Sequence, residues 1–126
     1  VKLGIVPGFG GTARLVRVVG RNVALEWILA GNNVPAQEAW RVGLVQKVLP
    51  ADELMPAAME LAKTLAARGP LAVRAARRLV RNAQDVPLAD ALDAEARAFA
   101  ALMEGHDAKE GMQAFLERRA PDFRGE

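Results

Sequence analysis

The sequence predicts a mainly α-helical fold with one or two short strands. Alanine, the strongest helix former, supplies much of the 52% apolar fraction, while aromatic residues make up only 5%. From residue 52 onward, apolar residues recur with the helical period of about 3.6 residues. Two shorter apolar runs, at residues 1–6 and 44–49, read as strands. We therefore divide the chain into residues 1–50, which mix short helices with strands, and residues 51–126, which form a helical region.

Glycine and proline divide the first fifty residues into short elements. We expect strands at residues 1–6 and 44–49 and helices at residues 12–19, 22–30 and 35–42. Thr12 has a side chain that can cap the first helix. Pro35 suits the first turn of the third helix. A glycine follows each of the three helices, as is common at helix ends: Gly20, Gly31 and Gly43.

The remaining residues read as four helices, at residues 52–68, 71–83, 88–105 and 107–119. The first has a clear apolar face, formed by Leu54, Ala57, Ala58, Leu61, Ala62 and Leu65. Asp107 and Glu110 have the spacing of a capping box, which would satisfy the free N–H groups at the start of the last helix. We expect the apolar faces of these helices to point inward and form a core.

The two predicted strands have no obvious partner in the chain. A strand must pair with another to satisfy its N–H and C=O groups. The chain also begins with Val1 rather than Met, inside one of these strands. We therefore expect this sequence to be a piece of a longer protein, whose N-terminal half would supply the missing partners.

Composition excludes several classes of site. The chain has no cysteine, so disulfides and thiolate chemistry are excluded, and its single His106 argues against a histidine-rich metal site. The net charge of +2 is too small to argue for nucleic-acid binding. There is no signal peptide and no apolar run long enough to span a bilayer, so we expect no membrane and a cytoplasmic location.

A glycine-rich loop at residues 7–11 is the first candidate site. The spacing Gly8-x-Gly10-x-x-Ala13 fits the dinucleotide fingerprint, but the second strand that this fingerprint requires is replaced by a helical segment at residues 24–29. A phosphate-binding P-loop fails because no lysine precedes Thr12. A tight turn without any ligand remains a reasonable alternative on these residues alone.

Longer motifs give a more specific indication. Residues 7–15 (PGFGGTARL) resemble the P-G-x-G-G-T-x-R-L signature of the enoyl-CoA hydratase/isomerase (crotonase) family. Similar motifs of that family follow in order at residues 29–31 (LAG), 36–45 (AQEAWRVGLV), 70–78 (PLAVRAARR) and 110–119 (EGMQAFLERR). The resemblance covers essentially the whole chain and corresponds to about the C-terminal half of the usual family member.

The resemblance implies a fold and an activity. The chain would be the C-terminal half of the crotonase-like α/β (ββα spiral) fold, with residues 1–50 ending its core and residues 51–126 forming the trimerisation helices. The intact enzyme would most simply hydrate a trans-2-enoyl-CoA, using an oxyanion hole of two backbone N–H groups and two glutamates. The oxyanion hole and the glutamates would all lie upstream of Val1, so we expect no activity from this chain alone. Isomerisation and other crotonase-type reactions share the scaffold and remain open.

The resemblance also assigns site residues. No catalytic side chain would lie in this chain, and the backbone of Gly8, beside the catalytic water, is the nearest candidate. The acyl pocket would be bordered by Pro7, Gly8, Phe9 and Gly10. Phe115 and Arg118 would contact the adenine and 3′-phosphate of coenzyme A across a subunit boundary. Coenzyme A would enter only as part of the substrate, with no other cofactor and no metal, in a trimer or dimer of trimers.

Two further features have simpler interpretations. Arg74, Arg77, Arg78 and Arg81 form one face of a helix, which we interpret as a solvated face rather than a nucleic-acid contact. The glutamates are expected to be solvated or to cap helices: Glu26, Glu38, Glu53, Glu60, Glu95, Glu104, Glu110, Glu117 and Glu126. A non-catalytic helical binding or oligomerisation module remains the alternative from another class of function.

Overall fold

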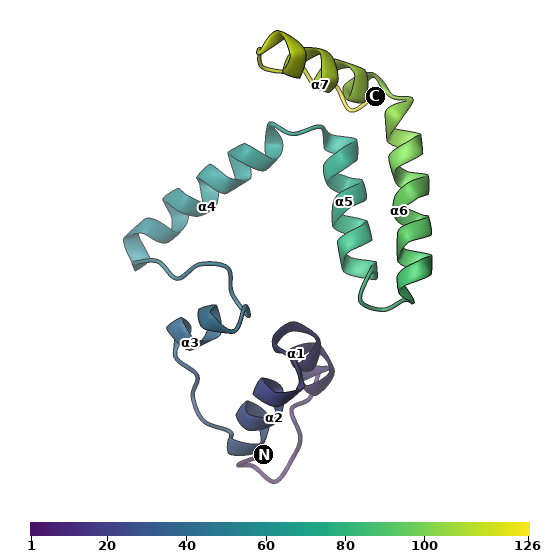
Figure 1. The fold of residues 1–126 in the computed structure, drawn as a ribbon. Coiled ribbons are helices and arrows are strands. Elements are labelled where there is room, and N and C mark those ends of the chain that lie inside the picture. The colour runs from purple at the N-terminus through teal and green to yellow at the C-terminus, as the bar shows by residue number, and fades with distance from the viewer. The chain divides into compact units, whose positions relative to one another are not determined.

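The computed structural model describes residues 1–126 and consists of seven helices without a strand (Figure 1). The helices are α1 (Gly11–Val19), α2 (Arg21–Ala30), α3 (Ala36–Arg41), α4 (Ala51–Ala66), α5 (Pro70–Asn82), α6 (Leu88–Met103) and α7 (His106–Glu117). The chain divides into two compact units, Val1–Glu53 and Leu54–Glu126. The roles assigned above to the two parts of the chain stay predictions.

In the first unit, α1 packs against α2, and the single residue Gly20 connects the two helices. Gly20 has φ 81°, a backbone conformation that an L side chain rarely adopts. Ala24 on α2 is 2% exposed, and Ala39 on α3 is also buried. Gly31, with φ 63°, ends α2, as the sequence predicts.

Both predicted strands are wrong. Residues 1–6 form turns and bends, with the Gly4 N–H donating to the Val1 carbonyl at 2.9 Å. Residues 44–49 are irregular, and the N–H groups of Leu44 and Val45 donate back to the Ala39 carbonyl. A strand forms only when a neighbouring strand accepts and donates its hydrogen bonds, and no such neighbour exists in this chain.

The expected cap of the first helix is also wrong. α1 begins at Gly11, one residue before Thr12, so Thr12 lies inside the helix. Gly10 precedes the helix in the left-handed conformation, with φ 76°, and no side chain caps it. The glycines therefore let the chain turn directly into the helix, without the hydroxyl that the sequence offered.

In the second unit, α5 and α6 run side by side, and α6 also contacts α7 (Figure 1). Pro70 is the first residue of α5, where its missing N–H costs nothing. Gly69, just before it, is buried against the ring of Phe123. The start of α5, the end of α6, α7 and the C-terminal residues thus meet in one place.

The predicted apolar faces exist, but they do not form a core. Ala24, Ala39 and Ala114 are the only buried hydrophobic residues. Leu54 and Leu65 on α4 are 56% and 51% exposed, and Phe99 on α6 is 66% exposed. An amphipathic helix gains stability only when another surface covers its apolar face, and in this structure these apolar faces are uncovered. No helix is both long and apolar enough to cross a membrane.

Candidate functional site

The glycine-rich loop at residues 7–11 forms a tight turn that is open to solvent. The Gly11 N–H donates to the Gly8 carbonyl at 2.9 Å and closes the turn. A Cβ placed on Gly11 would lie 3.0 Å from Cβ of Pro7, which shows how closely the chain folds back on itself. By contrast, a Cβ on Gly8 would meet no atom within 4 Å. The backbone of Gly8 is therefore accessible to a ligand.

Phe9 stands at the tip of this loop in a strained conformation. Its φ is 52°, in the left-handed region, and its side chain is fully exposed. The Arg14 guanidinium donates a hydrogen bond to the Phe9 carbonyl and so helps to hold this conformation. A phenylalanine exposed on a strained backbone contributes nothing to the packing of this chain, so its ring is available to a ligand or a covering surface.

The C-terminal end of α7 shows the same conformation at Arg118. The Arg118 N–H donates to the Phe115 carbonyl at 3.3 Å, and the Arg119 N–H donates to the Ala114 carbonyl at 3.0 Å. These two bonds form a Schellman motif, whose left-handed residue is usually glycine. Here the residue is Arg118, with φ 54°.

Phe9 and Arg118 are the only two non-glycine residues of the chain with positive φ. Placing an L side chain in this region costs about 1–2 kcal/mol relative to glycine. The resemblance described under Sequence analysis predicts both as site residues. They belong to different units of the chain.

Asp107 does not take part in a capping box, so that prediction is wrong. The residue before α7 is Gly105, and no side chain caps the helix. The Asp107 carboxylate instead accepts the N–H groups of Arg124 and Gly125, at 2.7 and 2.8 Å. Burial opposes its ionisation, but these bonds, aided by His106, lower the pKa of Asp107. The carboxylate therefore holds the C-terminal residues against the start of α7.

Glu110 holds the same tail one turn further along α7. Its two carboxylate oxygens accept both terminal nitrogens of Arg119, at 2.6 and 2.9 Å, and the Asp122 N–H donates to it at 2.8 Å. The Arg119 and Asp122 bonds together lower the pKa of Glu110 to about 2. Glu110 was expected to be solvated or capping, and it is neither. We call Asp107 and Glu110, with the backbone of residues 119–126, the tail clamp.

An apolar hollow of about 460 Å³ lies beside the tail clamp. Its walls include Phe115 and Met112 of α7, Leu71 of α5 and Phe123 of the tail. The Phe115 side chain is 83% exposed, and Arg118 is also exposed. The two residues predicted to bind coenzyme A therefore lie near each other at the end of α7 and reach solvent.

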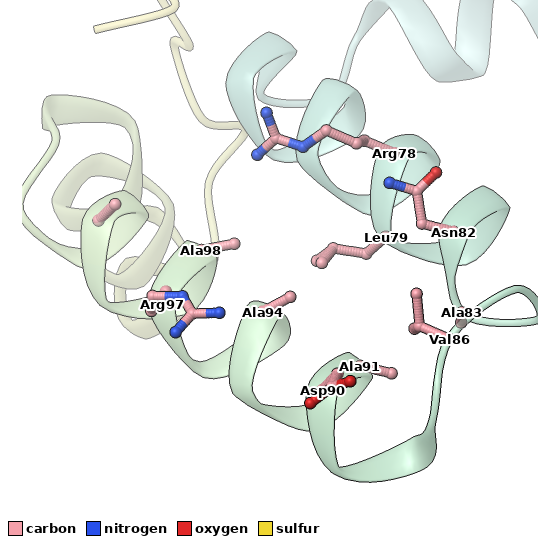
Figure 2. Close-up of a pocket in the computed structure, with 11 residues that line it drawn as sticks. Arg78, Leu79, Asn82, Ala83, Val86, Asp90, Ala91, Ala94, Arg97 and Ala98 are labelled. Atoms are coloured by element: carbon pink, nitrogen blue, oxygen red, sulfur yellow. The ribbon is translucent and has the colours of Figure 1, made fainter.

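The arginine face of α5 borders a second hollow, between α5 and α6 (Figure 2). Its walls carry Arg78 and Asn82 from α5 and small side chains such as Ala94 and Ala98 from α6. The four arginines of this face are exposed, and none forms an ion pair with a carboxylate. No group of three or more histidine or carboxylate side chains is placed to hold a metal ion.

Sequence reasoning missed the tail clamp. The helix-start pattern of Asp107 and Glu110 is real, but backbone N–H groups of the tail compete for the same carboxylates. A glycine at residue 111 and another at residue 125 are the signals that could have indicated it. A Cβ on Gly111 would lie 3.3 Å from the Phe123 ring, and one on Gly125 would lie 3.0 Å from Pro70.

Comparisons with known proteins match the whole chain. The family model described as enoyl-CoA hydratase/isomerase matches residues 1–126. A 2,3-dehydroadipyl-CoA hydratase of Escherichia coli is 42% identical over 99% of this chain and 49% of its own length. A crotonyl-CoA hydratase of Syntrophomonas wolfei is 41% identical over 98% of this chain and 47% of its own.

Solved structures match equally well. The crystal structure of an enoyl-CoA hydratase from Bacillus anthracis superposes with a TM-score of 0.94 at 42% identity. It covers 99% of this chain and 48% of the Bacillus chain. The chain thus spans about half the length of the relatives that it matches. With a family model that covers every residue, this chain belongs to the enoyl-CoA hydratase/isomerase family.

Proposed function

We propose that this chain is the C-terminal part of an enzyme that hydrates trans-2-enoyl-CoA thioesters. The observation that carries this proposal is the match of 42% identity, over 98% of the chain, to proteins named as probable enoyl-CoA hydratases. Water adds in syn fashion across the 2,3 double bond, and an oxyanion hole stabilises the enolate that forms. The catalytic glutamates and the oxyanion hole belong to the N-terminal half of the intact enzyme.

The glycine-rich loop forms one wall of the acyl pocket in this proposal. The accessible Gly8 backbone lies beside the water that attacks the double bond. Pro7, Phe9 and Gly10 border the acyl chain, and the exposed Phe9 ring gives the pocket an apolar surface. The loop supplies shape and a backbone amide, and it supplies no proton donor or acceptor of its own.

The end of α7 contributes to coenzyme A binding across a subunit boundary. The exposed Phe115 ring stacks on the adenine, and the exposed Arg118 guanidinium binds the 3′-phosphate. This arrangement requires a homo-oligomer, a trimer or a dimer of trimers. The exposed apolar faces of α4 and α6 support such an assembly, because neighbouring subunits and the N-terminal half would cover them.

The test compares the full-length protein with the 126-residue chain in hydration of crotonyl-CoA. We expect the enoyl-thioester absorbance of the substrate to fall when the full-length protein is added and to stay constant when the 126-residue chain is added. The chain alone lacks the acid–base groups, and losing such groups costs about 10²–10⁴-fold in rate. Activity of the chain alone contradicts the assignment of the catalytic groups. Conversion of a 3-enoyl-CoA, without hydration of crotonyl-CoA, identifies an isomerase instead.

A further inference from the structure

We propose that Glu110 is a positioning residue, which fixes the backbone of Arg118 so that its guanidinium meets the phosphate of coenzyme A. This inference rests on the proposed function and adds a residue to its site. Glu110 itself touches no substrate in this view. It acts through Arg119, the residue next to Arg118.

The first support is the geometry of the Glu110 carboxylate. It accepts both terminal nitrogens of Arg119 and also the Asp122 N–H, so three bonds hold one carboxylate. The Glu110 side chain is only 15% exposed, which limits competition from water. Because Arg119 and Asp122 lie on either side of Ala120 and Pro121, Glu110 fixes the chain where it leaves α7.

The second support is the backbone conformation that this network surrounds. Arg118 holds φ 54° between the last turn of α7 and Arg119. A non-glycine residue stays in this region only when its surroundings over-determine the conformation. The Arg119 N–H bond to the Ala114 carbonyl fixes one side, and the Glu110 carboxylate anchors the Arg119 side chain on the other. Loss of Glu110 removes the paired bonds that tie Arg119 to the middle of α7, and Arg118 can then relax toward an ordinary conformation, which turns its side chain away.

Glu117 offers a matched control on the same helix. Its carboxylate also contacts Arg119, at 2.6 Å from Nε, and it also accepts a bond from Gln113. The Glu117 side chain is 46% exposed and makes no bond to the tail beyond Arg119. Replacing Glu117 therefore removes a carboxylate from Arg119 but leaves the bond from Glu110 to the tail intact.

The experiment uses Glu110→Gln and Glu117→Gln in the full-length protein, with crotonyl-CoA and crotonyl-pantetheine as substrates. Crotonyl-pantetheine lacks the phosphates and the adenine. For Glu110→Gln, we expect KM for crotonyl-CoA to rise by about 3- to 10-fold, which corresponds to the loss of one well-placed hydrogen bond. The kcat for crotonyl-CoA should not change, and neither should KM or kcat for crotonyl-pantetheine. For Glu117→Gln, we expect all constants to stay within about twofold of wild type.

A double variant separates positioning from general damage. If Glu110 acts through Arg118, Glu110→Gln adds no further rise in KM once Arg118→Ala is present. An unchanged KM in Glu110→Gln, an equal rise for both thioesters, or a full additional rise in the Arg118→Ala background each overturns the inference. If Glu110→Gln does not assemble, Arg119→Lys, which keeps the charge but loses the paired bonds, must raise KM for crotonyl-CoA selectively.

Calorimetric titration with coenzyme A keeps this test independent of turnover. A wild-type protein that binds coenzyme A but hydrates neither thioester contradicts the proposed function. The dissociation constants of the variants for coenzyme A then still decide the role of Glu110. Glu110→Gln should weaken coenzyme A binding in the wild-type background and should not weaken it further in the Arg118→Ala background. A wild-type protein that does not bind coenzyme A overturns both.

Discussion

Replacing Arg118 by glycine should make the protein more stable and a weaker binder of coenzyme A at the same time. Arg118 has φ 54°, where an L side chain costs about 1–2 kcal/mol relative to glycine. Glycine also makes the unfolded chain more flexible, which lowers the free energy of unfolding by about 0.5–1 kcal/mol. The net expectation is a gain of about 0.5–1 kcal/mol in the free energy of unfolding, or about 1–4 °C in Tm for a protein of roughly twice this length.

The same substitution removes the proposed contact to the phosphate. A hydrogen bond to a charged group contributes about 1.5–3 kcal/mol, which corresponds to roughly 10- to 100-fold in the dissociation constant. Arg118→Lys keeps a positive charge and the strained backbone, so its affinity should fall less and its Tm should stay near wild type. Arg118→Ala lacks the charge and keeps the strain, which makes it the control for stability.

Two measurements on the full-length protein test this reasoning. Thermal unfolding is measured without ligand, since bound coenzyme A would itself raise Tm. Coenzyme A binding is measured by calorimetry on the same preparations. If Arg118→Gly melts no higher than Arg118→Ala, the positive φ stores no strain. If its affinity for coenzyme A stays within about twofold of wild type, Arg118 is not a phosphate contact.

Three further outcomes follow from the structure. Phe9→Gly should relieve the strain at φ 52° and raise Tm. It should also raise KM for crotonyl-pantetheine, because the acyl pocket loses an apolar wall. Equal KM values for the wild type and the variant would contradict the role of Phe9 as that wall. The ion pair of Glu110 and Arg119 should contribute stability above the unfolded pKa of about 4.5 and lose it as pH falls toward the folded value of about 2. The Tm difference between wild type and Glu110→Gln should therefore be constant above about pH 5 and shrink as pH falls from about 4.5 toward 2. A difference as large at about pH 2 as at about pH 7 would contradict this reasoning. Gly125→Ala should destabilise the tail, because Gly125 has φ +79° and the new Cβ would lie 3.0 Å from Pro70. Hydrogen exchange should then be faster at the amides of the clamped tail. Arg124→Ala, at an exposed position, is the control.

The helices could be predicted from the sequence because their signals are local. Hydrophobic period, glycine at helix ends and Pro70 at the first position of α5 each act within a few residues. The seven predicted helices all exist, with ends displaced by a few residues. The family motifs are equally local, and the match over residues 1–126 confirms the family that they indicated.

The predicted strands failed because a strand is not a local structure. Residues 1–6 have the composition of a strand, but their backbone groups need a second strand that this chain does not contain. The same reason applies to the core. The apolar faces of α4 and α6 are correctly periodic, yet Leu54 and Phe99 stay exposed because nothing in the chain covers them.

The sequence by itself determined the helices, the family and the position of the glycine-rich loop, because each depends on residues that are neighbours along the chain. Only the tertiary structure decided what Asp107 and Glu110 do. Their spacing fits a helix cap, but the N–H groups of Asp122, Arg124 and Gly125 reach the same carboxylates from 12 to 18 residues away. Competition between donors that are distant in sequence is settled by how the chain folds back, and for this physical reason Glu110 pairs with Arg119 and the Asp122 N–H instead of capping α7.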